Sequence, residues 1–194
     1  MKSMLRKLFF LLALSSSFVL TAQAETKTYT LDPSHTHVLW HISHFGFSNP
    51  SGKWFANGTL MIDEKKLKDS KLDVTIQVAD IVTGIPKLDE HLKSADFFDV
   101  AKFPTATFVS DKVVPTGKDS AKVYGTLTVR GISKPEVLMV KLNNKGLSPA
   151  SNKQTMGFSA STKIKRSDFG MTSHLPGLGD EVKIDIEAEA NTPS

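Results

Sequence analysis

The feature that most constrains this chain of 194 residues is a two-residue alternation of apolar and polar side chains that recurs along most of its length. Near the C-terminus, Val182, Ile184 and Ile186 alternate with charged residues, and the segment 71–78 alternates in the same way. A period of two gives a β-strand one apolar face and one wet face. Many such strands in one small domain must close into a barrel or pack as a sandwich.

Gly-, Pro- and Asn-rich turn signals separate the alternating segments, and their hairpin-like spacing favours antiparallel neighbours. No second composition or linker interrupts them, so we expect one domain. The pattern predicts a short leading strand over Thr28–Leu31 and eight further strands, at Ser34–Ile42, Trp54–Ile62, Ser70–Val78, Thr105–Lys112, Lys122–Val129, Val137–Leu142, Met156–Ile164 and Val182–Ala190.

The N-terminus has the pattern of an export signal. Basic residues Lys2, Arg6 and Lys7 precede a mostly apolar run over 8–20, and Ala22-Gln23-Ala24 follows. This order is typical of a cleavable secretory signal, and the apolar run is short for a membrane span. We predict a signal peptide over 1–24, a mature domain over 25–194, a periplasmic location and no integral membrane span after processing. An uncleaved anchor is the alternative.

Composition excludes several classes of protein. The chain has no cysteine, so it has no disulfide, thiolate nucleophile or lipoprotein acylation site. Three of its 24 basic residues precede the cleavage site, which leaves 21 against 20 acidic residues and gives no argument for nucleic-acid binding. Of its aromatic residues 12 are Phe, against 2 Trp and 2 Tyr, and this weighting suits an apolar interior.

One connection breaks the strand rhythm. The insertion Asp80–Pro104 does not alternate; Pro86 predicts the start of a short helix through Lys93, and three phenylalanines follow, Phe97, Phe98 and Phe103. The insertion is either a lid or pocket rim, or a plug of ordinary core at one end of the barrel. Within it, Asp89 and His91 either contact a ligand head group or cap the helix and tether the insertion.

The strand around 34–44 has a clear inner face. Thr36, Val38, Trp40, Ile42 and His44 share the apolar side, which we place inside, with His44 as its polar end. The opposite side carries three histidines, His35, His37 and His41, and His35 with His37 is a candidate metal pair. Because no further ligand is evident in the sequence, we predict no metal site.

No motif of nucleophilic catalysis is present: the chain lacks a Gly-x-Ser-x-Gly elbow as well as cysteine. We therefore predict no catalytic residues and no enzyme. The alternative is a lipid- or quinone-modifying enzyme with His44 as general base.

Several motifs, each weak alone, occur together in a specific order. They are Tyr-Thr-Leu-Asp-Pro-Ser-His at 29–35, His44 with Gly46, Asp-Glu-His-Leu-Lys-Ser-Ala-Asp-Phe-Phe-Asp at 89–99, Phe103-Pro104, Gly-Thr-Leu-Thr-Val-Arg-Gly-Ile-Ser-Lys-Pro at 125–135 and Arg-Ser-Asp-Phe-Gly at 166–170. Through these motifs the chain resembles the YceI-like proteins, and the resemblance extends from Tyr29 to about Ala190. The YceI-like proteins are periplasmic polyisoprenoid-binding proteins of lipocalin-like barrel shape.

The resemblance implies an eight-stranded antiparallel barrel that holds a long isoprenoid chain, with the polar head near the mouth. Two positions depart from the family pattern: Leu88 and Lys93 stand where arginine is usual. Losing an arginine removes a bidentate clamp for phosphate. The departure favours a neutral head, such as a quinone or an amide, over a diphosphate.

We therefore predict an all-β fold, an eight-stranded antiparallel lipocalin-like barrel with a short helix in the insertion, that binds and carries a small apolar ligand (a polyprenyl chain, a quinone or a fatty amide). We expect no cofactor other than such an isoprenoid- or quinone-like lipid, and the sequence leaves a homodimer open. A filled barrel acting as a stress or interaction protein is a further alternative. The ligand-binding residues we predict are Val38, Trp40, Ile42, His44, Val74, Ile76, Asp89, His91, Phe97, Phe98, Phe103, Phe108, Phe158 and Ile184.

Overall fold

A computed structural model describes residues 26–193. Its ten strands are β1 (Thr26–Leu31), β2 (His37–His44), β3 (Ser51–Phe55), β4 (Asn57–Asp63), β5 (Lys71–Gln77), β6 (Thr105–Pro115), β7 (Ser120–Val129), β8 (Ile132–Leu147), β9 (Gln154–Lys165) and β10 (Leu178–Asn191). One α-helix, α1 (Pro86–Lys93), and three short 3-10 turns, η1 (Leu67–Asp69), η2 (Val78–Asp80) and η3 (Arg166–Phe169), complete this part of the chain. The predicted signal peptide over 1–24 lies outside the described residues.

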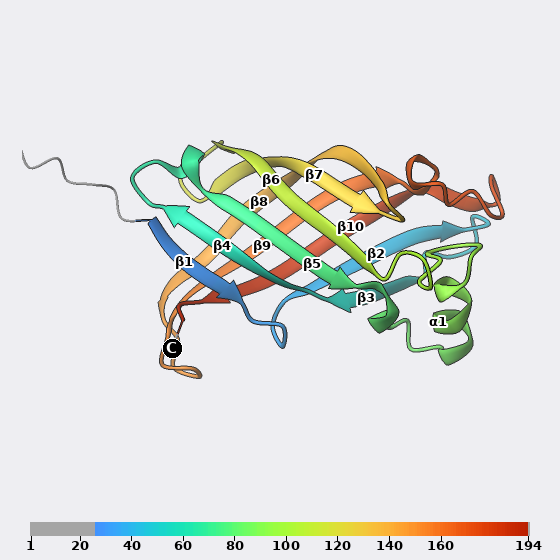
Figure 1. Cartoon of the computed structure of the whole chain (residues 1–194), viewed down its shortest axis with the longest axis horizontal. Coiled ribbons are helices and arrows are strands. Elements are labelled where there is room, and N and C mark those ends of the chain that lie inside the picture. Colours follow the sequence, from blue (N-terminus) through green and yellow to red (C-terminus); the bar gives the residue numbers. More distant parts are fainter. Residues whose placement is uncertain (1–25, 194) are drawn as a thin grey trace, which may run out of the picture.

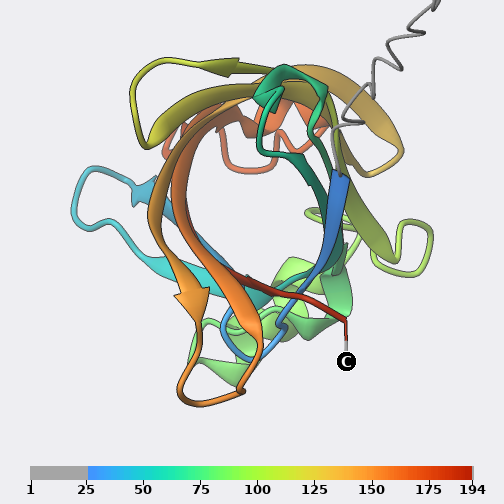
Figure 2. The same cartoon turned by 90° about the vertical axis from the view of Figure 1, so that its left-hand side faces the viewer.

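The ten strands form one closed antiparallel barrel of eight strand positions. Each strand from β4 to β10 pairs with the next in sequence, and β10 closes the ring onto β2 and β1. β2 pairs with β10 over residues 178–187 and β1 takes over at 190–191, so β1 and β2 share one position. β3 and β4 share the next, interrupted at Ala56. The ring of strands is seen end-on in Figure 2, and the predicted eight-stranded barrel is confirmed.

The helix lies at one end of the barrel (Figure 1). It begins at Pro86 and ends at Lys93, as the sequence predicts, because proline fits the first helical turn, where its missing N–H leaves no bond unmade. We refer to this end as the α1 end. The turns β2–β3 and β7–β8 and the segment 166–178 lie at the same end, and the β6–β7 and β8–β9 turns lie at the other.

Several strands differ from the sequence prediction, and the single strand predicted over Trp54–Ile62 is in fact two, β3 and β4, separated at Ala56. β2 begins at His37 and not at Ser34, because the Asp32 carboxylate accepts a hydrogen bond from the Ser34 N–H (2.9 Å) and holds residues 33–35 in a turn. β8 begins at Ile132, five residues before the predicted Val137. It includes Pro135, which is tolerated because the β8–β9 ladder starts only at Met139.

The inner faces carry most of the buried apolar side chains, in four clusters around the barrel wall. One cluster joins α1 to the barrel: Leu92 and Phe97 pack with Trp40 and Trp54. Another places Phe169, which is fully buried, against Val129 and Met171. Within residues 26–193, no helix has the length and apolar character needed to cross a lipid bilayer.

Candidate functional site

The barrel encloses a cavity of about 770 Å³. This lies within the range of about 300–1,000 Å³ usual for small-molecule sites. Its wall is almost wholly apolar and is built from the inward residues of every strand position. Of the fourteen residues that the sequence predicts to bind ligand, twelve line the cavity: Val38, Trp40, Ile42, His44, Val74, Ile76, His91, Phe97, Phe98, Phe108, Phe158 and Ile184.

The other two predicted residues, Asp89 and Phe103, do not line it. The Asp89 carboxylate accepts hydrogen bonds from the Thr83 N–H (2.8 Å) and hydroxyl (2.6 Å), so it tethers the start of α1 to the preceding loop. Phe103 stands over Gly131, where a side chain on the glycine would meet its ring at 2.9 Å. Asp89 thus has the tethering geometry that was the alternative to head-group contact.

The cavity reaches the surface at the α1 end. Its lining there combines apolar side chains of the insertion, Leu88 and Phe97 among them, with three histidines. His44 stacks edge-on against Phe45 with ring centroids 4.8 Å apart, and His91 against Phe97 at 5.0 Å. The third histidine is His174, whose ring centroid lies 6.4 Å from that of Phe97. The mouth is therefore aromatic and uncharged while its histidines are neutral.

Below the mouth, the two tryptophans fix the insertion to the barrel wall. Trp54 donates its indole N–H to the Val78 carbonyl (3.1 Å) and meets Phe98 edge-on, with ring centroids 5.2 Å apart. The ring centroids of Trp40 and Trp54 are 6.4 Å apart. Gly52, its partner on β3, gives the Trp40 ring room, since a Cβ there would come within 2.5 Å of it. The phenylalanines Phe97 and Phe98 are thus packed core and cavity wall at once.

Arg166 is a buried charged residue of the wall that is bonded to the backbone through all three of its guanidinium nitrogens. The side chain is 3 % exposed and donates to the carbonyls of Gly179 (2.7 Å), Met171 (2.8 Å) and Leu178 (3.0 Å). Burial lowers the pKa of the Arg166 guanidinium, which nearby Asp180 partly offsets. Because each of its three guanidinium nitrogens donates to a backbone carbonyl, Arg166 holds the segment 171–179 in place.

Glu136 brings a carboxylate to the same wall. It lies on β8 and lines the cavity, and desolvation by burial raises the pKa of its carboxyl, with the charge of Asp168 adding to the effect. The Val137 N–H acts in the opposite direction. A carboxylate in the cavity wall disfavours anionic ligands and favours neutral or hydrogen-bond-donating groups.

The opposite end of the cavity has a different character. Lys71, Lys118 and Asp119 contribute to the lining there, together with Ser120 at the start of β7. All four are exposed. The cavity therefore runs from an apolar α1 end to a polar, charged end.

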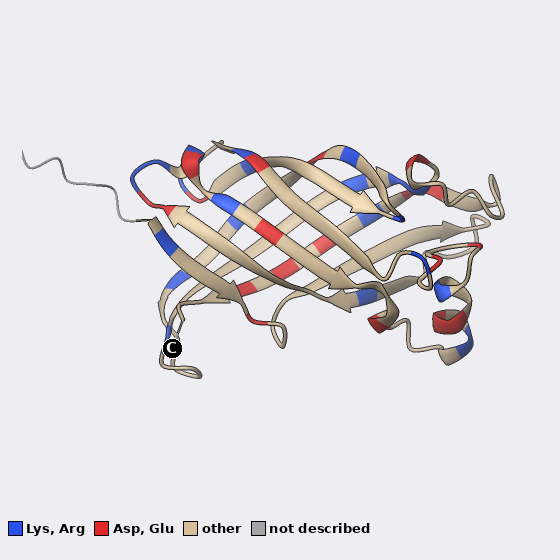
Figure 3. Ribbon diagram, viewed as in Figure 1, with Lys and Arg blue, Asp and Glu red and all other residues tan. Residues whose placement is uncertain are grey.

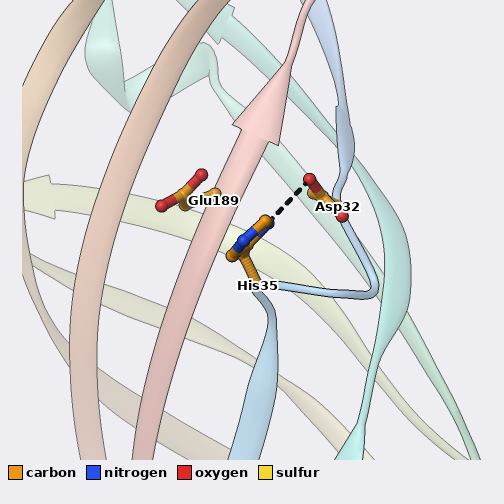
Figure 4. A group of neighbouring side chains, drawn as sticks. All are labelled: Asp32, His35 and Glu189. Atoms are coloured by element: carbon orange, nitrogen blue, oxygen red, sulfur yellow. Dashed lines mark hydrogen bonds and ion pairs between the residues drawn. The ribbon is translucent and has the colours of Figure 1, made fainter. Parts of the chain in front are cut away.

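The candidate metal pair His35 and His37 is not assembled on one strand face, because His35 lies in the turn before β2. Its Nδ1 instead meets Asp32 Oδ2 at 3.0 Å, and Glu189 of β10 lies nearby (Figure 4). This contact raises the pKa of His35 and lowers that of Asp32. Among residues 26–193 these three form the one group with metal-ligand spacing, but the Asp32 oxygens are already bonded to Ser34, His35 and Asn191.

The sequence did not identify Arg166, Glu136 and His174 as part of the wall. Glu136 could have been found, since it continues the inner face of Leu138, Val140 and Leu142 by steps of two. Arg166 lies in the turn η3 and His174 in the loop before β10, both outside the segments in which apolar and polar residues alternate. No periodic signal therefore marks them.

Comparison with known proteins places these features in context. The sequence profile described as the YceI-like domain matches residues 29–190. A UPF0312 protein of Azotobacter vinelandii is 35% identical over 189 residues, which cover 96% of this chain and 98% of that protein. Protein YceI of Salmonella arizonae is 37% identical over 179 residues, which cover 91% and 93%.

Solved structures share the barrel. Burkholderia cenocepacia BcnA superposes with a TM-score of 0.74 at 24% identity, covering 82% of this chain and 98% of that one. The Campylobacter jejuni YCEI protein gives 0.70 at 33%, covering 78% and 90%. A polyisoprenoid binding domain from Saccharophagus degradans gives 0.67 at 15%, covering 85% and 98%. BcnA and the Saccharophagus domain, both below 25% identity, are likenesses of fold alone.

Proposed function

The chain belongs to the YceI-like family, and we propose that it binds and carries a long apolar molecule with an uncharged head group, an isoprenoid, a quinone or a fatty amide, in the periplasm. The observation that carries the proposal is the apolar cavity of about 770 Å³ along the barrel axis. A solved domain of the same fold is described as polyisoprenoid binding, which is consistent with such cargo.

The driving force is desolvation of the ligand chain. Each CH₂ removed from water contributes about 0.8 kcal/mol, so a long chain can bind tightly with no specific polar contact. The wall provides apolar surface for the ligand chain along its whole length, from Trp40 and Phe98 at the α1 end to Val74, Phe108 and Phe158 deeper in the barrel. A cavity of this volume also counts against the filled-barrel alternative.

The charges of the wall support an uncharged head group. Leu88 lines the mouth at a position where the resemblance to the YceI-like pattern implies arginine, and each guanidinium nitrogen of Arg166 donates to a backbone carbonyl. Glu136 adds a carboxylate that would repel a phosphate or a fatty acid. Arg130, in the β7–β8 turn at the α1 end, donates to the backbone carbonyls of Ala95 and Phe97 and does not line the cavity.

The rival function, an enzyme using His44 as base, draws no support from the geometry around that residue. The contact made by the His44 ring is with Phe45, and no hydrogen bond joins the ring to a nucleophile or a carboxylate within residues 26–193. We therefore propose a carrier and not a catalyst. Its export rests on the Ala22-Gln23-Ala24 site, and a mature N-terminus at Glu25 in the osmotic-shock fraction tests it.

The two tryptophans make a direct binding test available, because Trp40 and Trp54 are the only two in the chain and both line the cavity. Titration with a quinone that bears a long isoprenoid tail should quench their fluorescence saturably. The same quinone without a tail should quench far less, since it lacks the apolar chain. Polyprenyl diphosphate should compete poorly. Equal affinity for the tailed and tailless quinones would overturn the proposal.

A further inference from the structure

Four large apolar side chains stand in solvent around the mouth of the cavity. They are Phe45, Phe47, Ile85 and Leu175, exposed by 51%, 92%, 57% and 36%. We call these four residues the apolar rim. They come from three separate segments: the β2–β3 turn, the residue before α1 and the loop that precedes β10. Singly exposed apolar residues are ordinary, but four around one opening form a patch of the kind that contacts another phase or protein.

Specific contacts hold the rim in shape. The Phe45 N–H donates to the Gly177 carbonyl (2.9 Å), which joins the β2–β3 turn to the loop carrying Leu175. The Phe47 N–H donates to the His44 carbonyl (3.0 Å), and Gly46 at the tip adopts a positive φ of 76°. The ring of Phe47 is thereby presented outward on an ordered turn.

The rim is continuous with the cavity. Phe45 and Ile85 are both exposed at the surface and part of the cavity lining, which also includes His44 and His174. A molecule that leaves through the α1 end must pass across these side chains. The surface that borders the mouth is therefore as apolar as the cargo proposed for the cavity.

The charge distribution distinguishes the two ends of the barrel. Residues 42–52 and 169–179 contain no Asp, Glu, Lys or Arg, and are therefore tan in Figure 3. The nearest formal charge along the Ile85 loop is Lys87, which is exposed and forms no ion pair with a described residue. The opposite end presents Lys71, Lys118 and Asp119. An uncharged aromatic tip matches the boundary between head groups and acyl chains of a bilayer, and Lys87 adds one exposed cation beside it, on a helix that also carries Asp89 and Glu90.

We propose that the apolar rim docks onto the surface of a lipid bilayer and sets the mouth of the barrel against the lipid phase. Phe47 and Ile85 enter the boundary between head groups and acyl chains, and Lys87 lies at the level of the phosphates. Cargo then passes between membrane and barrel without crossing water. The cargo step rests on the proposed function, whereas docking itself does not.

The test uses the mature chain and vesicles of equal parts phosphatidylethanolamine and phosphatidylglycerol, with flotation to measure partitioning. Phe47→Ala should reduce the partition coefficient about tenfold or more, since a phenylalanine is lost from the buried surface. Leu147→Ala is the matched control: Leu147 is 60% exposed at the end of β8, at the opposite end of the barrel. It should change partitioning less than twofold. Both sites are solvent-exposed, so both variants should fold as wild type.

Two results would overturn docking. The first is vesicle partitioning that is undetectable, or equal for wild type and Phe47→Ala. The second is a concentration-dependent dimer that dissociates on Phe47→Ala, which would assign the rim to a second copy of the chain. Lipid extracted from each purified protein separates the two proposals: if wild type carries none but Phe47→Ala still loses vesicle binding, docking stands and the carrier function fails.

Discussion

Replacing Val74 by tryptophan distinguishes a hollow barrel from a filled one. Val74 lies in the middle of β5, between Gly58 of β4 and Phe108 of β6, and its half-buried side chain lines the cavity. In a packed core the added ring would cost about 1–3 kcal/mol. For a chain of this size that corresponds to a fall in Tm of about 2–12 °C. In a cavity of about 770 Å³ the indole has room, and the cost should be close to zero.

The assay measures thermal unfolding of ligand-free proteins together with extraction of what each protein carries. Ligand must be removed first, because a ligand that binds only the folded state raises Tm by mass action. We expect Val74→Trp to unfold within about 2 °C of ligand-free wild type, and to carry little apolar ligand because the indole occupies its space.

Val109→Trp is the matched control. Val109 is 46% exposed and lies on the outer face of β6, beside Phe108 in sequence. The same substitution there should change neither Tm nor ligand content. If Val74→Trp instead unfolds several degrees lower and still carries lipid, the interior is packed at that point and the ligand lies elsewhere.

Four further outcomes follow from the wall and the insertion. Because burial raises the pKa of Glu136 above its ordinary 4.5, its ionisation opposes folding, so Glu136→Gln should melt above wild type near pH 7 and converge with it below about pH 4; a constant difference would contradict this. Arg166→Lys replaces the three nitrogens that bond the carbonyls of Gly179, Met171 and Leu178 by one ammonium, and should lower the free energy of unfolding by about 1.5–3 kcal/mol in denaturant titration; no loss would refute its role. Ligand should slow hydrogen exchange in 80–104 more than in 182–190, and equal protection would argue against contact with the insertion. Chelator should leave Tm unchanged, and a fall of several degrees would show that His35 or its neighbours bind metal.

The barrel could be predicted from the sequence because its signals are local. Alternation with period two specified the strands and the inward face of β2, including Trp40 and Ile42. Pro86 marked the first residue of α1, because proline fixes the backbone φ at a helical value and the N–H that it lacks would have no partner within the helix at this position. The cavity is the sum of these inner faces, so most of its lining followed from them.

The remaining features depend on contacts distant in sequence. Glu136 is an exception, because its position follows from the two-residue step of Leu138 and Val140; it was missed because its side chain is charged, and the first half of β8 was missed with it. Arg166 is held by carbonyls of residues 171–179, which only the folded turn brings to it. The barrel closes because β10 pairs first with β2 and then, near its C-terminal end, with β1. This arrangement depends on the register of the strands, which the local sequence does not determine.

The central claim is that the barrel carries an apolar molecule with an uncharged head, and it is tested most directly by extracting the purified mature protein with organic solvent and identifying what is released by mass spectrometry. The account predicts a long-chain isoprenoid, quinone or amide, without phosphate, near one molecule per barrel, and absent from Val74→Trp. A phosphorylated or free-acid lipid would contradict the part assigned to Leu88, Arg166 and Glu136. Recovery of no lipid, with no saturable quenching of Trp40 and Trp54 by a tailed quinone, would contradict the claim itself.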